Sequence, residues 1–240
     1  MSAPPARAVL FDFGGTLYDY ATLEPGDREC LLALARWAGI DAEEPEVRQA
    51  YRQAMRRAFH TYLPRRFYLH RDLFRDAAAG MLESFGVEPD DAQLERYRQM
   101  QWALHRRDFA LRDGVVETLQ ALRARGLHVG MVSNIDDDQL DHLIDVAGLR
   151  DHFDSLLSSE AAGACKPESA IFATALGRAG CAPGEALFVG DTLAQDIAGA
   201  NRMGLRSVLL WHRDDREPLL EEVQPHHVIR RIPELLAIVD

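Results

Sequence analysis

After residue 113 the sequence alternates between short apolar runs and helix-like segments, and this alternation limits the possible fold more than any other feature. The run Leu127–Val132 is typical of a buried strand. The segment Val115–Arg125 before it has helical spacing and is followed by Gly126, the residue that most often ends a helix. Similar units follow to the end of the chain. They predict an α/β fold with a doubly wound parallel sheet and right-handed crossovers.

The beginning of the chain adds one strand and then a long interruption. The apolar run Ala8–Phe13 ends in two glycines, which predict a tight turn. From about Leu17 to Arg112 the sequence is rich in arginine, has helical periodicity and contains few β-branched residues. We therefore expect a core domain of residues 1–17 and 113–240 and an inserted helical domain of residues 18–112. The expected helices of the insertion are Cys30–Trp37, Val47–His60, Asp72–Phe85 and Ala92–His105.

Polar residues at the ends of the predicted strands are candidate site residues. In doubly wound sheets, ligands bind outside the carboxyl ends of the strands. Side chains at these ends therefore come together although they are far apart in the sequence. In this chain they are Asp12, Ser133, Asn134, Ser158, Ser159 and Asp191.

The residue types at these positions point to a particular chemistry. Asp12, on a rigid strand before a glycine-rich turn, can serve as a nucleophile and as a metal ligand. Ser133 can hydrogen-bond an anionic group of a substrate. Lys166 is the only lysine of the chain, and the proline after it keeps the backbone extended, which can direct the ammonium inward. Asp191 is a hard oxygen ligand suited to Mg²⁺, and Asp196 either caps a helix or supports the metal site.

In their order along the chain these residues resemble the four motifs of the haloacid dehalogenase superfamily. The motifs correspond to Asp12–Leu17, Met131–Asn134, Lys166–Phe172 and Val189–Ala200. The resemblance covers nearly the whole chain and implies a Rossmann-like fold. A helical insertion between the first two motifs resembles the subclass with a C1 cap domain.

The resemblance implies a catalytic role for three residues. Asp12 would attack the substrate and form a covalent aspartyl intermediate, while Ser133 and Lys166 hold the transferring group. Asn134, next to Ser133, is a further candidate for substrate binding.

The resemblance also implies Mg²⁺ as the cofactor. The predicted metal site consists of the carboxylates of Asp12 and Asp191 and the backbone carbonyl of Gly14, with Asp196 beside them. A backbone carbonyl is present whatever the side chain, so Gly14 can still serve.

Gly14 itself departs from the family pattern. Phosphatases of the family usually have a second Asp there, which protonates the leaving alcohol and then activates water. Such acid–base help contributes roughly 10²–10⁴-fold, so its loss is severe for alcohol leaving groups and slight for weakly basic ones. Family members without this Asp include dehalogenases and phosphonate hydrolases. The insertion lacks the lysine of the phosphonate hydrolases, and the intact pair Gly190 and Asp191 is unusual for a dehalogenase.

We therefore expect Mg²⁺-dependent phosphoryl transfer from a small phosphorylated metabolite. Two alternatives stay open: a dehalogenase-like hydrolase that acts without metal, and a catalytically weak protein that binds a phosphorylated ligand. Arg65 and Arg66 of the insertion could supply guanidinium groups for a carboxylate or a second phosphate, or could belong to a solvated surface.

Charge and cysteine content limit the partners and the compartment. A net charge of −11 argues against nucleic acid and against anionic membrane surfaces, but not against a small anionic substrate. The three cysteines have no metal-ligand spacing, Met1–Arg7 does not look like a signal peptide, and no apolar run approaches about 20 residues. We expect a cytoplasmic protein, and the sequence predicts no particular oligomeric state.

Overall fold

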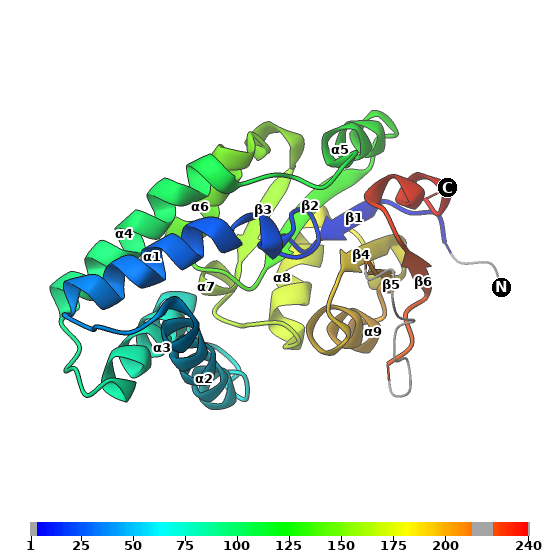
Figure 1. Cartoon of the computed structure of the whole chain (residues 1–240). Helices are drawn as coiled ribbons and strands as arrows, with labels where there is room; N and C mark the ends of the chain where they lie inside the picture. Colours follow the sequence, from blue (N-terminus) through cyan, green and yellow to red (C-terminus); the bar gives the residue numbers. More distant parts are fainter. Residues whose placement is uncertain (1–3, 213–222, 240) are drawn as a thin grey trace. The chain divides into compact units, whose positions relative to one another are not determined.

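Contacts within the chain divide it into two compact units (Figure 1). The structure, a computed structural model, describes residues 4–212 and 223–239. The first unit, here called the core unit, consists of Met1–Asp19 and Ala110–Asp240, and the second, the helical unit, is Tyr20–Phe109. Each unit is described by itself below.

The helical unit is slightly shorter at both ends than the predicted insertion, residues 18–112. Hydrogen bonds explain the difference, because they join the two connecting segments to each other within the core unit. The backbone N–H of Arg112 donates to the carbonyl of Leu17 (2.9 Å), and its guanidinium lies 3.3 Å from the carboxylate of Asp19. That the helical unit acts as a cap stays a prediction.

In the described residues of the core unit, six strands form one parallel sheet in the order β3-β2-β1-β4-β5-β6. This confirms the predicted fold class, a doubly wound α/β sheet. The strands are β1 (Ala8–Phe11), β2 (His128–Ser133), β3 (Ser155–Ser158), β4 (Ala186–Gly190), β5 (Arg206–Leu210) and β6 (His227–Ile229).

Helices cover both faces of this sheet, which explains why its central strands are apolar throughout. Helices α8 (Ser169–Ala179) and α9 (Ala198–Met203) lie on one side and α5 (Val115–Ala124) on the other (Figure 1). Leu10 of β1 and Phe188 of β4 are fully buried in the same apolar cluster as Phe172 of α8. Burial of each such side chain contributes about 1.5–3 kcal/mol, so the two strands that carry Asp12 and Asp191 are held rigidly.

The strand order reverses between β1 and β4, which is where doubly wound sheets form a ligand-binding crevice. The chain leaves β1 toward β2 and β3 on one side, and then returns to the other side of β1 to form β4, β5 and β6. The connections therefore diverge at this pair, and ligands of doubly wound sheets bind at such a point. Asp12 follows β1 and Asp191 follows β4.

Two helical segments of the core unit contain turns that are not α-helical. A π-helical turn, η4 (Leu193–Ile197), comes directly before α9. The Thr192 carbonyl accepts both from Asp196 N–H (3.0 Å) and from Ile197 N–H (3.2 Å), which widens the turn. The last helical segment of the described residues is the 3₁₀ helix η5 (Ile232–Ala237). Other helical elements are α6 (Asp137–Ala147), α7 (Ser159–Ala162), η2 (Arg150–His152) and η3 (Pro183–Glu185).

The helical unit contains two pairs of packed helices. Helix α1 packs against α4, and α2 packs against α3. Leu34, Met81 and Leu82 are fully buried between them. Each predicted helix is present, with ends that differ by a few residues. The helices are α1 (Glu24–Trp37), α2 (Glu44–Tyr62), α3 (His70–Ser84) and α4 (Asp91–Asp108), preceded by η1 (Tyr20–Thr22).

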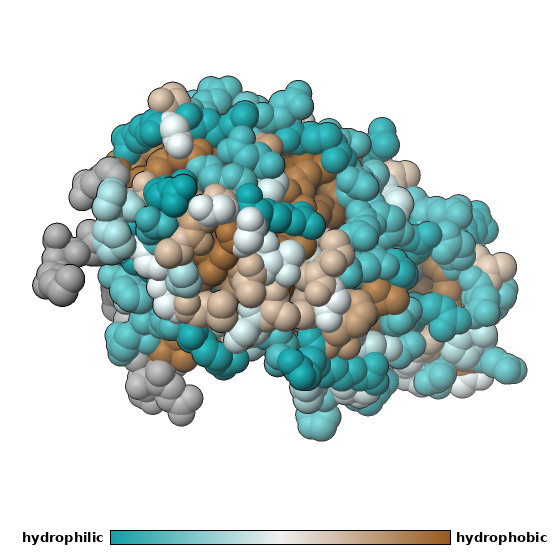
Figure 2. Space-filling view, turned by 180° about the vertical axis from the view of Figure 1, so that it is seen from behind, coloured by the Kyte–Doolittle hydropathy of each residue, from teal (hydrophilic) through white to brown (hydrophobic). Residues whose placement is uncertain are grey.

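The surface opposite to the view of Figure 1 is hydrophilic along most of its edge, with apolar side chains visible nearer its middle (Figure 2). Among the described residues, no helix is long and apolar enough to span a membrane. The expectation of no signal peptide concerns Met1–Arg7, of which residues 1–3 lie outside the described part of the chain.

Candidate active site

Asp12 is held at the carboxyl end of β1 by its backbone and by its side chain. Its N–H donates to the carbonyl of Val189 (2.8 Å), which continues the pairing of β1 with β4. Its Oδ1 accepts from Lys166 Nζ (2.5 Å) and Ser133 Oγ (3.2 Å), and its Oδ2 accepts from Thr16 Oγ1 (3.1 Å). The three predicted catalytic residues, Asp12, Ser133 and Lys166, therefore lie in direct contact.

Lys166 joins two carboxylates in the interior of the core unit. Its Nζ donates to Asp12 Oδ1 and also to Asp196 Oδ1 (2.7 Å), and its side chain is only 2% exposed. Burial by itself would lower the pKa of Lys166, but the two carboxylates outweigh burial and raise this pKa above its usual range. The lysine is therefore a fixed positive charge. Its peptide bond to Pro167 is cis.

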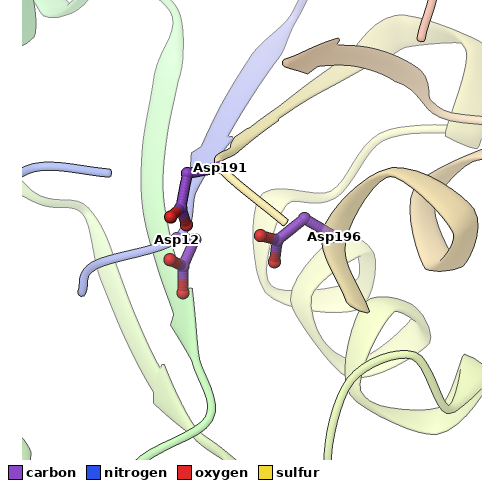
Figure 3. Close-up of side chains that lie close together, drawn as sticks. All are labelled: Asp12, Asp191 and Asp196. Atoms are coloured by element: carbon purple, nitrogen blue, oxygen red, sulfur yellow. The ribbon is translucent and has the colours of Figure 1, made fainter. Parts of the chain in front are cut away.

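Asp191 packs against the turn that follows Asp12. Thr16 Oγ1 lies 3.4 Å from Asp191 Oδ1, so one hydroxyl contacts both carboxylates. Gly15 has a φ of +83°, and a Cβ at this position would lie 2.4 Å from Asp191 Oδ2. Only glycine lets the backbone pass so close to the carboxylate. Figure 3 shows Asp12 and Asp191 side by side, with Asp196 directed toward them from the other side.

Asp196 is fixed by hydrogen bonds on both of its oxygens. Oδ1 accepts from Lys166, and Oδ2 accepts from the backbone N–H (3.0 Å) and the hydroxyl (2.6 Å) of Thr192. Gly190 makes room for it, because a Cβ there would lie 2.4 Å from Asp196 Cγ. Asp196 thus holds Lys166 in place, and its direct binding of a metal stays a prediction.

The carboxylates outnumber the positive charges, which makes the cluster suitable for a divalent cation. Ligand atoms of Asp12, Asp191 and Asp196 all lie within 4.8 Å of one another, with Lys166 as the ammonium in contact with two of them. Burial raises the pKa of Asp191 to about 7, and the charges of Asp12 and Asp196 add to this effect. Burial also raises the pKa of Asp12. Carboxylate oxygens are the ligands that Mg²⁺ prefers, and a cation would relieve this repulsion.

The remaining predicted residues have different surroundings. Gly14 is partly buried in the turn between Asp12 and Thr16, and the role of its carbonyl as a metal ligand stays a prediction. Arg65 and Arg66 are exposed residues of the helical unit, where the guanidinium of Arg65 stacks over the ring of Tyr62 (4.2 Å). Their binding of substrate stays a prediction.

Asn134, predicted to bind substrate, is hydrogen-bonded within the protein. Its side-chain amide contacts the backbone of Lys166 and the side chain of Gln195. Ser158 and Ser159, the other polar residues at strand ends, also have local partners. Ser158 caps α7 by accepting from Ala161 N–H (2.8 Å), and Ser159 Oγ donates to the Ile135 carbonyl (3.0 Å).

Four residues of the site had no predicted role. Thr16 could have been found, because it lies within the first motif, four residues after Asp12. Thr192 could have been found because it lies directly before the turn that contains Asp196. No pattern in the sequence points to Gln195 or Arg112, because their partners are distant along the chain. Gln195 accepts from Asn134, and the guanidinium of Arg112 donates twice to the carbonyl of Gly15 (2.9 and 3.1 Å).

A doubly wound sheet with buried carboxylates and a buried lysine at its crevice is typical of an α/β enzyme. The chain belongs to the haloacid dehalogenase-like hydrolases, because the sequence profile of that family matches residues 6–204. It is therefore a hydrolase, as predicted.

Relatives with similar lengths include named phosphatases. The chain is 31% identical over 222 residues to haloacid dehalogenase-like hydrolase domain-containing protein 3 of Homo sapiens, covering 88% of this chain and 86% of that protein. It is 32% identical over 243 residues to the glyceraldehyde 3-phosphate phosphatase of Methanopyrus kandleri, with 97% of each chain covered. It is 29% identical over 240 residues to the ribulose-1,5-bisphosphate 5-phosphatase of Halopiger xanaduensis, covering 98% and 99%.

A solved structure has the same fold. The HAD-hydrolase YfnB from Bacillus subtilis bound to magnesium superposes with a TM-score of 0.79, covering 99% of this chain and all of that chain. The two sequences are 22% identical, so this similarity bears on the fold alone.

The raised pKa of Asp191 predicts that Mg²⁺ stabilises the protein more at about pH 8 than at about pH 5.5. Without metal, folding raises this pKa from 3.8 to about 7, so the folded state binds a proton that the unfolded state has released. Stability is therefore lost as the pH rises from about 4 to about 7. A bound cation relieves this repulsion, but below about pH 7 it must displace the proton and binds more weakly.

Thermal unfolding with and without Mg²⁺ at the two pH values measures this difference. The matched control is Asp191→Asn, in which the shift of Tm by Mg²⁺ should be small and should no longer depend on pH in this range. An equal shift at both pH values in the unsubstituted protein would contradict the charge balance described above.

Proposed function

We propose that the protein is a Mg²⁺-dependent phosphatase that hydrolyses a small phosphorylated metabolite through a covalent phosphoryl group on Asp12. The observation that carries this proposal is the contact of the buried Asp12 carboxylate with the Lys166 ammonium, 2.5 Å apart, in the crevice between β1 and β4. The names of two relatives support phosphate ester hydrolysis. The three carboxylates that lie within 4.8 Å of one another support the choice of a hard divalent metal.

In the first step the phosphoryl group is transferred to Asp12, and Lys166 and Ser133 assist. A carboxylate oxygen of Asp12 attacks phosphorus, an O–P bond forms, and the bond from phosphorus to the leaving oxygen breaks. Lys166 gives one N–H to Asp12 and one to Asp196, so its third N–H can donate to an oxygen of the transferring phosphoryl group. The one O–H of Ser133 donates to Asp12 before substrate binds and would turn to a phosphoryl oxygen when it does. In the second step a water molecule attacks the same phosphorus atom and the bond from phosphorus to Asp12 breaks. This releases phosphate and restores the Asp12 carboxylate, and the proton of the water passes to the phosphate or to solvent.

The metal would be held by Asp12, Asp191 and the Gly14 carbonyl, with Asp196 nearby. When bound, Mg²⁺ offsets the negative charge that phosphate and the carboxylates bring together. Without such an offset, the anionic substrate would enter a buried cluster that already has excess negative charge.

The turn after Asp12 supplies no acid for the leaving group. It consists of Phe13, Gly14, Gly15 and Thr16, and the hydroxyl of Thr16 already donates to Asp12. An alkoxide would therefore take its proton from water, from the substrate or from a side chain outside this turn, such as Asp19, which favours substrates whose leaving groups are weak bases.

We expect phosphate release that needs both Mg²⁺ and Asp12. The measurement is inorganic phosphate production from a panel of sugar, glycerol and aryl phosphates, with Mg²⁺ and with a chelator. Asp12→Asn is nearly isosteric and keeps a side chain that can hydrogen-bond Ser133 and Thr16, yet it cannot attack phosphorus. Its activity should fall below detection.

Two outcomes would contradict the proposal. Phosphate release that continues in Asp12→Asn would show that another group performs the attack. No phosphate from any ester, together with halide release from 2-haloacids in the presence of chelator, would favour the dehalogenase-like alternative.

Because position 14 has no acidic side chain, we predict that Gly14→Asp raises kcat for alkyl phosphates. Gly14 is not among the glycines with positive φ, so its backbone accepts an L-residue. We expect a gain of about tenfold or more for alkyl phosphates, a fraction of the roughly 10²–10⁴-fold that a general acid can contribute. Aryl phosphates should gain little.

The matched control is Gly14→Asn, which has nearly the same shape and no acid. If Gly14→Asp and Gly14→Asn change kcat for alkyl phosphates equally, protonation of the leaving group is not what limits the reaction.

A further inference from the structure

The side-chain amide of Asn134 is hydrogen-bonded to both backbone groups of Lys166. Asn134 Oδ1 accepts from Lys166 N–H (2.7 Å), and Nδ2 donates to the Lys166 carbonyl (3.1 Å). The two bonds also fix the orientation of the amide, because only its oxygen can accept from the N–H group. Asn134 follows β2, so the lysine backbone is tied to the rigid sheet.

Gln195 uses the second N–H of the same amide. Asn134 Nδ2 also donates to Gln195 Oε1 (3.2 Å). Gln195 lies in the π-helical turn η4, directly before Asp196, whose Oδ1 accepts from Lys166 Nζ. The contacts thus form a closed ring from the backbone of Lys166 through Asn134, Gln195 and Asp196 to the ammonium of the same lysine.

These bonds leave no donor of the Asn134 amide for an anionic substrate. A primary amide has two N–H groups, and here one donates to Lys166 and the other to Gln195. What remains is a lone pair on Oδ1, which repels a phosphate or carboxylate. Binding of substrate through this side chain would break a bond to the buried Lys166, which is 4% exposed.

We propose that Asn134 and Gln195 form an amide clamp that positions Lys166, and that Asn134 acts through this lysine and not by binding substrate. A free lysine side chain has several rotatable bonds and loses about 2 kcal/mol of rotamer entropy when it is fixed. The clamp fixes the backbone from which the side chain starts, and the two carboxylates fix its end. The kinetic consequence of the clamp rests on the proposed phosphatase function, whereas its structural consequence does not.

The composition of the chain allows a direct test, because Lys166 is its only lysine. In NMR spectra of protein labelled with ¹³C at lysine Cε, the only labelled group is the Cε methylene of Lys166. No other lysine overlaps with it. When the side chain is fixed, the two Cε protons have separate chemical shifts, and when it rotates freely the shifts merge. In Mg²⁺-containing buffer the unsubstituted protein should show two separate shifts.

Removal of either amide should bring the two shifts together. The variants are Asn134→Ala, which removes the whole clamp, and Gln195→Ala, which removes one acceptor and is the milder change. The matched control is Asn201→Ala on α9. Its amide also has two partners, the Gln224 carbonyl (2.8 Å) and the Ser207 hydroxyl (2.6 Å), but neither belongs to the site. In the control the Lys166 signals should not change.

Kinetics provide the second readout. If the clamp positions Lys166, kcat should fall about 10- to 100-fold in Asn134→Ala, the range typical of residues that orient a ligand or catalytic group, with a smaller change in KM. Gln195→Ala added to Asn134→Ala should cost little more, because both residues act as one unit. A direct contact with substrate would instead raise KM and leave kcat near its original value.

Separate, unchanged Lys166 shifts in either Asn134→Ala or Gln195→Ala would overturn the clamp. So would a rise in KM alone in Asn134→Ala. If Asn134→Ala does not fold, Gln195→Ala still decides the question. If the unsubstituted protein releases no phosphate from any ester, the proposed function fails, but the NMR comparison still tests the clamp.

Discussion

The site depends on one buried ammonium shared by two buried carboxylates. Lys166 contacts Asp12 at 2.5 Å and Asp196 at 2.7 Å, and neither carboxylate could stay charged in the interior without it. Removal of one partner from a buried ion pair lowers the free energy of unfolding by about 3–5 kcal/mol, so loss of any one of these three side chains would be strongly destabilising. Asp191 adds a carboxylate that no ammonium or guanidinium of the described residues contacts, and its raised pKa reflects that imbalance. The excess of negative charge that destabilises the protein without metal therefore favours the binding of a cation.

The sheet keeps this cluster together. Strands β1 and β4 are neighbours and are fully buried, so Asp12 and Asp191, which follow them, cannot move apart. Glycines at positions 15 and 190 let the carboxylates of Asp191 and Asp196 approach the backbone more closely than any side chain would allow. The fold therefore brings like charges together in one place, which makes sense only if the charge itself has a use. We propose that Asp12 uses its charge to attack the substrate, and that the carboxylates together hold a metal cation.

Local patterns in the sequence predict the parts of the site that strands carry. Asp12, Ser133 and Asp191 could be found because each comes at the end of an apolar run, and the topology of a parallel sheet brings such ends together. The π-helical turn before α9 could not be predicted, since it depends on how the Asp196 side chain reaches back to Thr192. The partners of Asn134 were also hidden, because Gln195 is 61 residues away and no repeated pattern relates the two. Asn134 was therefore assigned to substrate binding by its place beside Ser133.

The central claim is that Asp12 carries the phosphoryl group between two displacements, and the stereochemical course of hydrolysis tests it most directly. The measurement uses a good substrate whose phosphorus is made chiral with sulfur and oxygen isotopes, hydrolysed in isotopically labelled water. Each in-line displacement inverts the phosphorus. A covalent intermediate on Asp12 requires two displacements and predicts overall retention of configuration. Overall inversion would mean that water attacks the substrate directly, and would contradict the role assigned to Asp12.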